Sequence, residues 1–342
     1  MLPKLKGANN EFCINANTKL NIFTPTFIIA EIGINHEGNF NLAKTLVDKA
    51  FNAGADAVKF QIVNPDHSYS KNTQSYKVFK NAKLSEDSYR KIINLFSKNG
   101  LIFATPGDLD SLYLCEKLKF KLYKISSGLF TNVPLLKAVK RTRKPIILST
   151  GMASDQDISK IIKLIANKKR NNLSILHAVS LYPAPILKSN LNSIKYIEKK
   201  YNVVSGYSDH CFGWEACKIA VALGAKIIEK HFTLDKKRKG FDHKISLDPV
   251  DFKKMVSEIR IIEKIKGKYE KKPLDEELKV KNNIERYCVA SKEILKGDRI
   301  TVKNVFFKRV KNIRRGIKAY DFDSISEKKS KNHYKKNDII TY

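Results

Sequence analysis

The sequence predicts a closed parallel α/β barrel followed by a small β-rich module. Eight short apolar runs, rich in β-branched residues, alternate with helix-like stretches, as expected for parallel strands joined by crossover helices. Eight such units over roughly 220 residues favour a (β/α)8 TIM barrel over an open sheet. An open doubly wound sheet would also need a glycine fingerprint after its first strand, and Gly33–Gly38 does not provide one.

The individual elements follow from this alternation in chain order. Asn10–Phe23 alternates apolar and polar residues, so we expect a hairpin that covers the bottom of the barrel. Helices are predicted over Asn41–Ala53, Ser85–Asn99 and Asp155–Lys168, and again over Pro249–Ile265. The eight predicted strands are Phe27–Ile32, Ala57–Gln61, Leu101–Thr105, Lys121–Ile125, Pro145–Ser149, Leu173–His177, Asn202–Ser205 and Lys226–His231.

The character of the chain changes after the last barrel helix. A charged, weakly apolar linker containing Gly267 and Pro273 is followed by short strand-like segments without a long amphipathic helix. We therefore expect an N-terminal cap over residues 1–26, the barrel over 27–266, the linker over 267–282 and a β-rich module over 283–342. A module of this size is small enough to need partner contacts for stability.

The amino-acid composition narrows the range of functions that the chain could have. The formal net charge is +31, yet the positive excess is spread along the chain and no nucleic-acid-binding module is visible, so we expect no nucleic-acid partner. The five cysteines are scattered and form no CxxC pair, which favours reduced thiols in a cytoplasmic protein. No stretch approaches the ~18 consecutive apolar residues of a membrane span, so no membrane contact is expected.

Two lysines stand at the ends of predicted strands. Lys59 and Lys124 lie in apolar surroundings, where a lysine is costly to bury unless it is paired, and both converge on one rim of the barrel. We expect them to bind a phosphate or a carboxylate. The alternative is a structural ion pair within the barrel, with Glu31 or Glu229 as the carboxylate. The hydroxyl groups expected at the same level belong to Thr105, Ser127, Ser149 and Ser208.

Two histidines stand at the ends of the last two predicted strands. His210 follows Ser208 and Asp209 after the seventh strand, and His231 ends the eighth. Two imidazoles on neighbouring strand ends, with Glu229 nearby, could hold a divalent metal with open positions for a substrate. The alternative is that each histidine is a hydrogen-bonded residue of the rim without a ligand.

Several short motifs together carry a resemblance to a known family. They are Asn9–Phe12, Ala30–Gly38, Gly54–Gln61, Tyr123–Gly128, Ile147–Met152, Tyr182–Pro183, Tyr207–His210 and Glu229–Thr233. Each motif alone is weak, but their order and spacing are specific and cover nearly the whole chain. In these motifs the chain resembles the sialic acid synthases, which include N-acetylneuraminate, legionaminate and pseudaminate synthases and spore-coat relatives. The tail resembles the antifreeze-like (SAF) domain that ends these enzymes.

The resemblance implies a carbon–carbon bond-forming transferase (EC 2.5.1 type). Phosphoenolpyruvate would condense with the open-chain aldehyde of an N-acetylmannosamine-type sugar to give a nonulosonic acid and phosphate. It implies that His210 and His231 bind Mn²⁺, or Mg²⁺ or Co²⁺ in the same site, as a Lewis acid for the aldehyde oxygen. Catalytic roles are implied for Lys59 and Lys124 and for two glutamates that handle protons or orient water, Glu31 and Glu229.

The resemblance also assigns the substrate contacts. Phosphoenolpyruvate would be held by Lys59, Thr105, Lys124, Ser127, Ser149 and Ser208, and the sugar by Gln61, Ser180, Tyr182, Asp242 and Arg309. Arg309 would come from the tail of a second subunit, which implies a domain-swapped homodimer. The tail departs from the usual Arg-Pro-Gly of the family, so Arg314 and Arg315 are alternatives for this role.

Other departures bear on the sugar. Gly107 follows Thr105-Pro106 where family members often have phenylalanine, and Ser180 replaces the asparagine of sialate-type enzymes, which favours a bacillosamine-derived or other deoxy sugar. Two further interpretations stay open. One is a phosphoenolpyruvate-dependent synthase that uses a different aldehyde sugar. The other is a non-catalytic protein that binds carbohydrate or polyanion through its positive charge.

Overall fold

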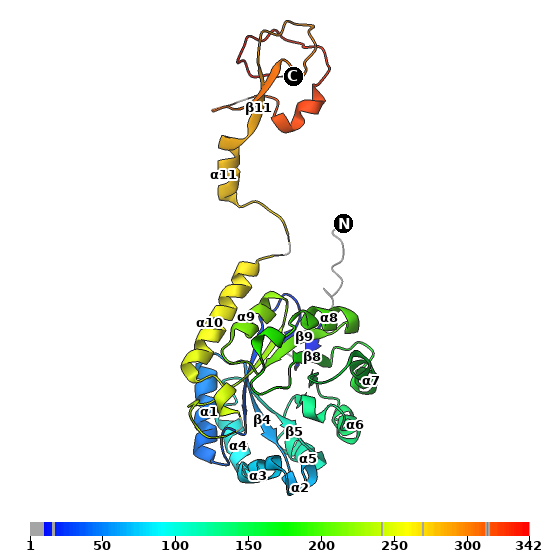
Figure 1. The fold of residues 1–342 in the computed structure, drawn as a ribbon, viewed down its shortest axis with the longest axis vertical. Coiled ribbons are helices and arrows are strands. Elements are labelled where there is room, and N and C mark those ends of the chain that lie inside the picture. The colour runs from blue at the N-terminus through cyan, green and yellow to red at the C-terminus, as the bar shows by residue number, and fades with distance from the viewer. Residues whose placement is uncertain are drawn as a thin grey trace. The chain divides into compact units, whose positions relative to one another are not determined.

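The computed structural model describes residues 10–15, 18–240, 242–268, 270–311, 313 and 315–341. The chain divides into two compact units, with the boundary between Gly267 and Lys268 (Figure 1). Each unit has its own hydrophobic core. Among the described residues, no helix is long and apolar enough to cross a membrane.

Eight parallel strands close into a barrel in the first unit, as the sequence predicts (Figure 1). The order around the barrel is β10-β3-β4-β5-β6-β7-β8-β9, so that neighbours in the chain are neighbours in the sheet and the last strand pairs with the first. The strands are β3 (Phe27–Gly33), β4 (Ala57–Ile62), β5 (Leu101–Pro106), β6 (Tyr123–Ile125), β7 (Ile146–Ser149), β8 (Leu173–Ala178), β9 (Val204–Asp209) and β10 (Ile227–His231).

One strand extends further than its sequence indicates. The prediction ended the seventh strand at Ser205, but β9 continues to Asp209. A side chain at Gly206 would lie 2.4 Å from the carbonyl oxygen of Ile227, so the glycine permits close packing against β10.

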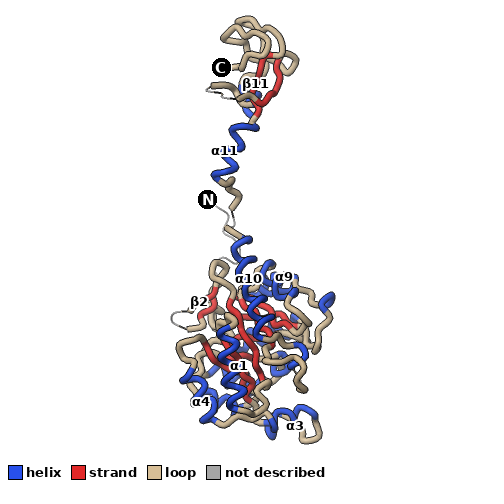
Figure 2. Tube along the Cα trace, turned by 90° about the vertical axis from the view of Figure 1, so that its left-hand side faces the viewer, coloured by secondary structure: helices blue, strands red, loops and turns tan. Residues whose placement is uncertain are grey.

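Helices cover the outside of the barrel (Figure 2). Short polar side chains cap the first turns of all of them except α8 and α9. Asn39 accepts from the backbone N–H of Leu42, and Ser154 forms a capping box with Asp157. The helices are α1 (Phe40–Asn52), α2 (Pro65–Ser68), α3 (Gln74–Asn81), α4 (Glu86–Leu95), α5 (Leu109–Lys117), α6 (Val133–Arg141), α7 (Asp155–Ile165), α8 (Asn192–Tyr201), α9 (Glu215–Ala222) and α10 (Pro249–Lys266).

The inside of the barrel is apolar at its amino-terminal end. There, β1 (Phe12–Cys13) and β2 (Lys19–Leu20) form an antiparallel hairpin that closes this end. Phe12 and Leu20 from the hairpin are buried in one cluster with Phe27 and Phe103 from the strands. With the amino-terminal end filled by hydrocarbon, polar side chains inside the barrel lie toward the carboxyl-terminal mouth.

The second unit contains a helix that the sequence analysis treated as part of a linker. Helix α11 (Asp275–Ile284) has three acidic residues in its first turn, where carboxylates interact favourably with the helix dipole. It is followed by the antiparallel strands β11 (Arg286–Ala290) and β12 (Val305–Arg309) and a 3₁₀ segment, η4 (Ala319–Ser324). A helix, a pair of short strands and a 3₁₀ segment thus belong to this unit, which has a small core of its own.

Candidate functional site at the mouth of the barrel

A layer of charged side chains crosses the barrel above its apolar core. Glu31, Lys59, Lys124 and Glu229 point inward from four strands, and each is at most 5% exposed. The Nζ of Lys59 lies 2.9 Å from Oε2 of Glu31 and 3.7 Å from Oε2 of Glu229. The Nζ of Lys124 lies 3.2 Å from Oε1 of Glu229. The ion pairs named as the structural alternative for the two lysines are therefore present.

Hydroxyl and amide groups complete this layer. Lys59 donates to Oγ1 of Thr105 at 3.2 Å, and Ser208 donates to Glu229 at 2.9 Å. Gln61 donates to Oε1 of Glu31 at 2.7 Å. Gly33 makes room for this last contact, because a side chain there would lie 3.2 Å from both partners. Hydrogen bonds from residues on neighbouring strands thus fix the orientation of the Glu31 and Glu229 carboxylates.

Burial and mutual attraction set the protonation of the four groups. Burial raises the pKa of Glu31, although Lys59 opposes the shift. Burial alone would also raise the pKa of Glu229, but Lys124 and Lys59 outweigh it and lower it to about 2. The pKa of Lys124 falls to about 8 because burial outweighs its attraction to Glu229. Burial also acts to lower the pKa of Lys59, but Glu229 and Glu31 overcome it and the pKa is raised.

The two predicted histidines lie together directly above this layer. The ring centroids of His210 and His231 are 5.6 Å apart, and both side chains are buried. Burial lowers the pKa of both rings, and for His231 the neighbouring His210 lowers it further. Both imidazoles are therefore neutral near pH 7, which is the form that binds a metal.

The hydrogen bonds of these rings fit a divalent metal. Nδ1 of His210 lies 2.8 Å from the carbonyl oxygen of Val179, which accepts its proton and leaves the lone pair on Nε2. That Nε2 is 3.1 Å from the hydroxyl of Tyr182. Nδ1 of His231 is buried without a hydrogen-bond partner, and Asp242 lies 3.7 Å away. Two neutral imidazoles and a neighbouring carboxylate are a suitable donor set for Mn²⁺ or a similar ion.

A cavity of about 600 Å³ opens above these groups. Its inner wall includes Thr105, Ser127, His231 and Asp242, and its outer wall mixes polar and apolar side chains. Burial, with the charge of Glu31, raises the pKa of Asp242 to about 7. The hydroxyls of Ser149 and Ser180 are buried without protein partners, whereas Ser127 accepts from the backbone N–H of Gly151 at 2.9 Å. The space is thus lined by His231, Asp242 and hydroxyl groups, and two of its lining residues, Gln61 and Thr105, contact the charged layer.

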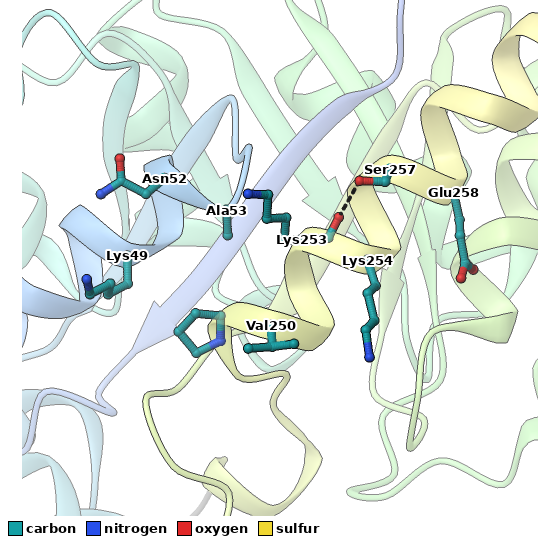
Figure 3. A pocket seen from close by; sticks show the side chains of 9 residues that line it. Lys49, Asn52, Ala53, Val250, Lys253, Lys254, Ser257 and Glu258 are labelled. Atoms are coloured by element: carbon teal, nitrogen blue, oxygen red, sulfur yellow. Dashed lines mark hydrogen bonds between the residues drawn. The ribbon is translucent and has the colours of Figure 1, made fainter.

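A second cavity of about 590 Å³ lies between α1 and α10, outside the barrel wall (Figure 3). Lys49 and Asn52 line it from α1, and Lys253 and Ser257 line it from α10. Ser257 donates to the carbonyl oxygen of Lys253, within the same helix. The two cavities have similar volumes, but only the mouth brings together buried titratable groups from several strands, so it is the better candidate site.

Some residues of the site escaped the sequence analysis. Helices α2 and α3, between β4 and β5, supply Tyr69, Val78 and Phe79 to the outer wall of the cavity. The helix-capping residues Asn64 and Thr73 were the available signal for these short helices. Nearby, His243 is buried and contacts Thr233 at 2.7 Å and Glu37 at 3.1 Å, which anchors the loop that carries Asp242.

The remaining predicted residues are Asp209 on the barrel and the arginines of the second unit. Asp209, expected at the rim, points to the outer face of the barrel wall, where it pairs with Lys230. The physical reason is the alternation of side chains along β9, which turns Ser208 inward and Asp209 outward. Arg309 is exposed on β12 of the second unit, Arg315 is exposed in the same unit, and Arg314 lies outside the described residues.

The closed parallel barrel, with titratable side chains gathered at the carboxyl ends of its strands, defines the class as an enzyme-type α/β barrel. Residues 46–271 match the model of the NeuB family. The chain belongs to this family, that of the sialic acid synthases.

The relatives cover nearly all of the chain. An uncharacterized protein of Methanocaldococcus jannaschii is 42% identical over 317 residues, covering 92% of this chain and 93% of its own. The N,N'-diacetyllegionaminic acid synthase of Campylobacter jejuni is 36% identical and covers 92% of this chain and 98% of its own. The solved N-acetylneuraminic acid synthetase of Leptospira borgpetersenii, in complex with citrate, is 36% identical with a TM-score of 0.75, covering 80% and 96% of the two chains.

Proposed function

We propose that this chain condenses phosphoenolpyruvate with an N-acetylmannosamine-type amino sugar to form a nonulosonic acid. In this reaction C3 of phosphoenolpyruvate bonds to the aldehyde carbon of the open-chain sugar. Water adds to C2, and inorganic phosphate leaves. The observation that carries the proposal is the pair of buried lysines, Lys59 and Lys124, at the carboxyl ends of the strands. Lys59 contacts Thr105, which lines the same cavity as His231.

To bind phosphoenolpyruvate, the two lysines would exchange their glutamate partners for the phosphate or carboxylate oxygens of the substrate. Lys59 and Lys124 would donate to those oxygens, with hydroxyls from Thr105, Ser127, Ser149 and Ser208 around them. The free hydroxyl of Ser149 supports this role, because a buried donor without a partner costs free energy until a ligand satisfies it.

The two glutamates would take different parts in proton handling. The raised pKa of Glu31 suits it to accept a proton when the anion reaches Lys59, which also removes a competing charge. Glu229, whose pKa is lowered, stays ionised and holds Lys124 and Ser208 in place. Either carboxylate is close enough to the lysines to orient the water that attacks C2.

His210 and His231 would hold Mn²⁺, or Mg²⁺ or Co²⁺ in its place. The bound ion would supply Lewis acidity that polarises the aldehyde oxygen of the sugar. The protein's own part is orientation: Val179 fixes the tautomer of His210, and Tyr182 packs on its ring with centroids 4.2 Å apart.

The sugar would occupy the outer part of the cavity. Gln61, Ser180, Tyr182 and Asp242 line this part and offer polar contacts for hydroxyl and amide groups. Its remaining wall includes Val63, Phe79 and Leu129, and no lysine or arginine is among the described lining residues. This lining favours a neutral, deoxy or N-acylated sugar over a sugar phosphate.

We further propose that residues 283–342 form an antifreeze-like (SAF) domain that acts in a domain-swapped homodimer. Arg309 would reach the N-acyl group in the site of the second subunit, with Arg314 and Arg315 as alternatives. The exposed position of Arg309 on β12 leaves it available for such a contact. Light scattering tests whether the chain is a dimer. Mixing Arg309→Ala subunits with His231→Ala subunits tests the swap, because only a swapped dimer regains activity on mixing.

The experiment that tests the main proposal is product analysis. The chain, phosphoenolpyruvate and Mn²⁺ are incubated with a panel of 2-acetamido and 2,4-diacetamido mannose- and altrose-type sugars, and with sugar 6-phosphates. We expect mass spectrometry to detect a nine-carbon 2-keto acid, with one phosphate released per molecule of product. EDTA should abolish this reaction and added Mn²⁺ should restore it. If no sugar of this panel supports phosphate release but a different aldose does, the chain is instead another keto-acid synthase.

A further inference from the structure

A fully buried ion pair lies directly behind the two histidines, on the outer face of the barrel wall. Asp209 and Lys230 are Cα partners on β9 and β10. The Nζ of Lys230 is 2.8 Å from Oδ2 of Asp209, and both side chains are 0% exposed. Because side chains alternate along a strand, this pair points toward α9, while the adjacent residues His210 and His231 point into the mouth.

The pair also holds the backbone that carries His210. Lys230 donates to the carbonyl oxygen of Cys211 at 2.5 Å, and the backbone N–H of Cys211 donates to Asp209 at 3.0 Å. Both polar backbone groups of the residue after His210 are therefore tied to the ion pair. Cys217 on α9 donates to Oδ2 of Asp209 at 3.2 Å, which gives the carboxylate a further partner in the helix layer.

Stability alone does not account for these contacts. Removing two charges from water is costly, and well-packed apolar side chains of similar volume often stabilise a protein as much as a buried ion pair or more. Apolar side chains cannot, however, tie the turn after β9 to the end of β10 at a fixed distance. We propose that Asp209 and Lys230 are positioning residues that set the spacing and direction of His210 and His231 for one shared divalent cation.

This inference rests on the proposed function, because it requires the two imidazoles to bind a metal. The test measures Mn²⁺ binding itself, from the electron paramagnetic resonance signal of free Mn²⁺ titrated with the full-length chain. Asp209→Leu combined with Lys230→Met removes both charges, since a single replacement would leave an unpaired buried charge. Circular dichroism and thermal unfolding check that this double variant is folded.

The expected result is a folded double variant whose Kd for Mn²⁺ is raised about 10- to 100-fold, as is typical when a group supporting a metal ligand is lost. If that variant does not fold, Asp209→Asn with Lys230→Met keeps the acceptor for the Cys211 N–H and should show the same loss. Two controls should keep the wild-type Kd: Cys217→Ala, and Glu116→Gln with Lys144→Met, an ion pair elsewhere on the barrel.

Two outcomes would contradict the inference and can be told apart. A folded double variant that binds Mn²⁺ within threefold of the wild type would overturn the positioning role alone. A wild-type chain that binds Mn²⁺ no better than His231→Ala would remove the proposed metal site, and the positioning role with it.

Discussion

Glu31 and Lys59 face each other on neighbouring strands, with Oε2 of the glutamate 2.9 Å from Nζ of the lysine. Gln61 fixes the second carboxylate oxygen of Glu31 at 2.7 Å. The glutamate therefore has a defined direction inside the barrel and a raised pKa caused by burial. A carboxylate held in this way can take up a proton next to a bound anion without a change in backbone position.

Replacement of Glu31 tests that role. Glu31→Gln keeps the shape of the side chain but cannot accept a proton, so we expect kcat to fall about 10²- to 10⁴-fold, the usual contribution of a general acid–base group. Phosphate release under saturating substrates measures it. Glu86→Gln, on helix α4 outside the barrel, is the matched control and should keep the wild-type rate. A Glu31→Gln rate within threefold of wild type would argue against proton handling at this position.

The pH dependence should report Lys124. Its pKa is lowered to about 8 by burial, so the side chain is a cation below pH 8 and neutral above it. Because the cation binds the anionic substrate, kcat/KM for phosphoenolpyruvate should fall about tenfold per pH unit above pH 8. Initial rates from pH 6.5 to 9.5 measure this. Lys124→Arg stays charged throughout this range, so it should show no such fall; an identical fall in this variant would place the titrating group elsewhere.

The space at Gly107 should limit the size of the sugar. Gly107 lines the cavity, and a side chain there would meet Cγ2 of Val63 at 2.7 Å. We expect Gly107→Val to raise KM for the amino sugar at least tenfold, with KM for phosphoenolpyruvate within about twofold, because the lysines lie below this wall.

Steady-state kinetics with each substrate varied in turn measures the effect. Gly128→Ala is the control, since Gly128 lines the same cavity but no atom lies within 4 Å of an added Cβ. Equal changes in both KM values for Gly107→Val would indicate a general distortion of the mouth.

The N-terminal hairpin should contribute to stability through its buried aromatic ring. Phe12 is 0% exposed in the apolar cluster that closes the barrel, so Phe12→Ala should lower the free energy of unfolding by about 3–5 kcal/mol. Denaturant unfolding of the full chain measures it. Phe23→Ala removes a ring that is 78% exposed and should change stability by no more than about 0.5 kcal/mol. Similar effects of both substitutions would show that the hairpin does not seal the barrel in solution.

Local patterns in the sequence were enough to predict the barrel and many of the polar residues at its mouth. The β-branched runs at Ala57–Gln61 and Lys226–His231 were recognisable locally, because strand preference and alternation depend on neighbouring residues. The same alternation, together with the rule that active-site groups gather at the carboxyl ends of barrel strands, predicted a common rim for Lys59, Lys124 and the two histidines.

Tertiary structure alone decided how these groups pair. Lys124 and Glu229 are 105 residues apart and meet only because the barrel closes and brings β6 and β10 to opposite sides of one narrow interior. The pairing of β9 with β10 also set Asp209 beside Lys230, and the short helices α2 and α3 supply part of the wall of the cavity. Contacts between distant strands depend on the curvature of the sheet, which no local pattern of residues encodes.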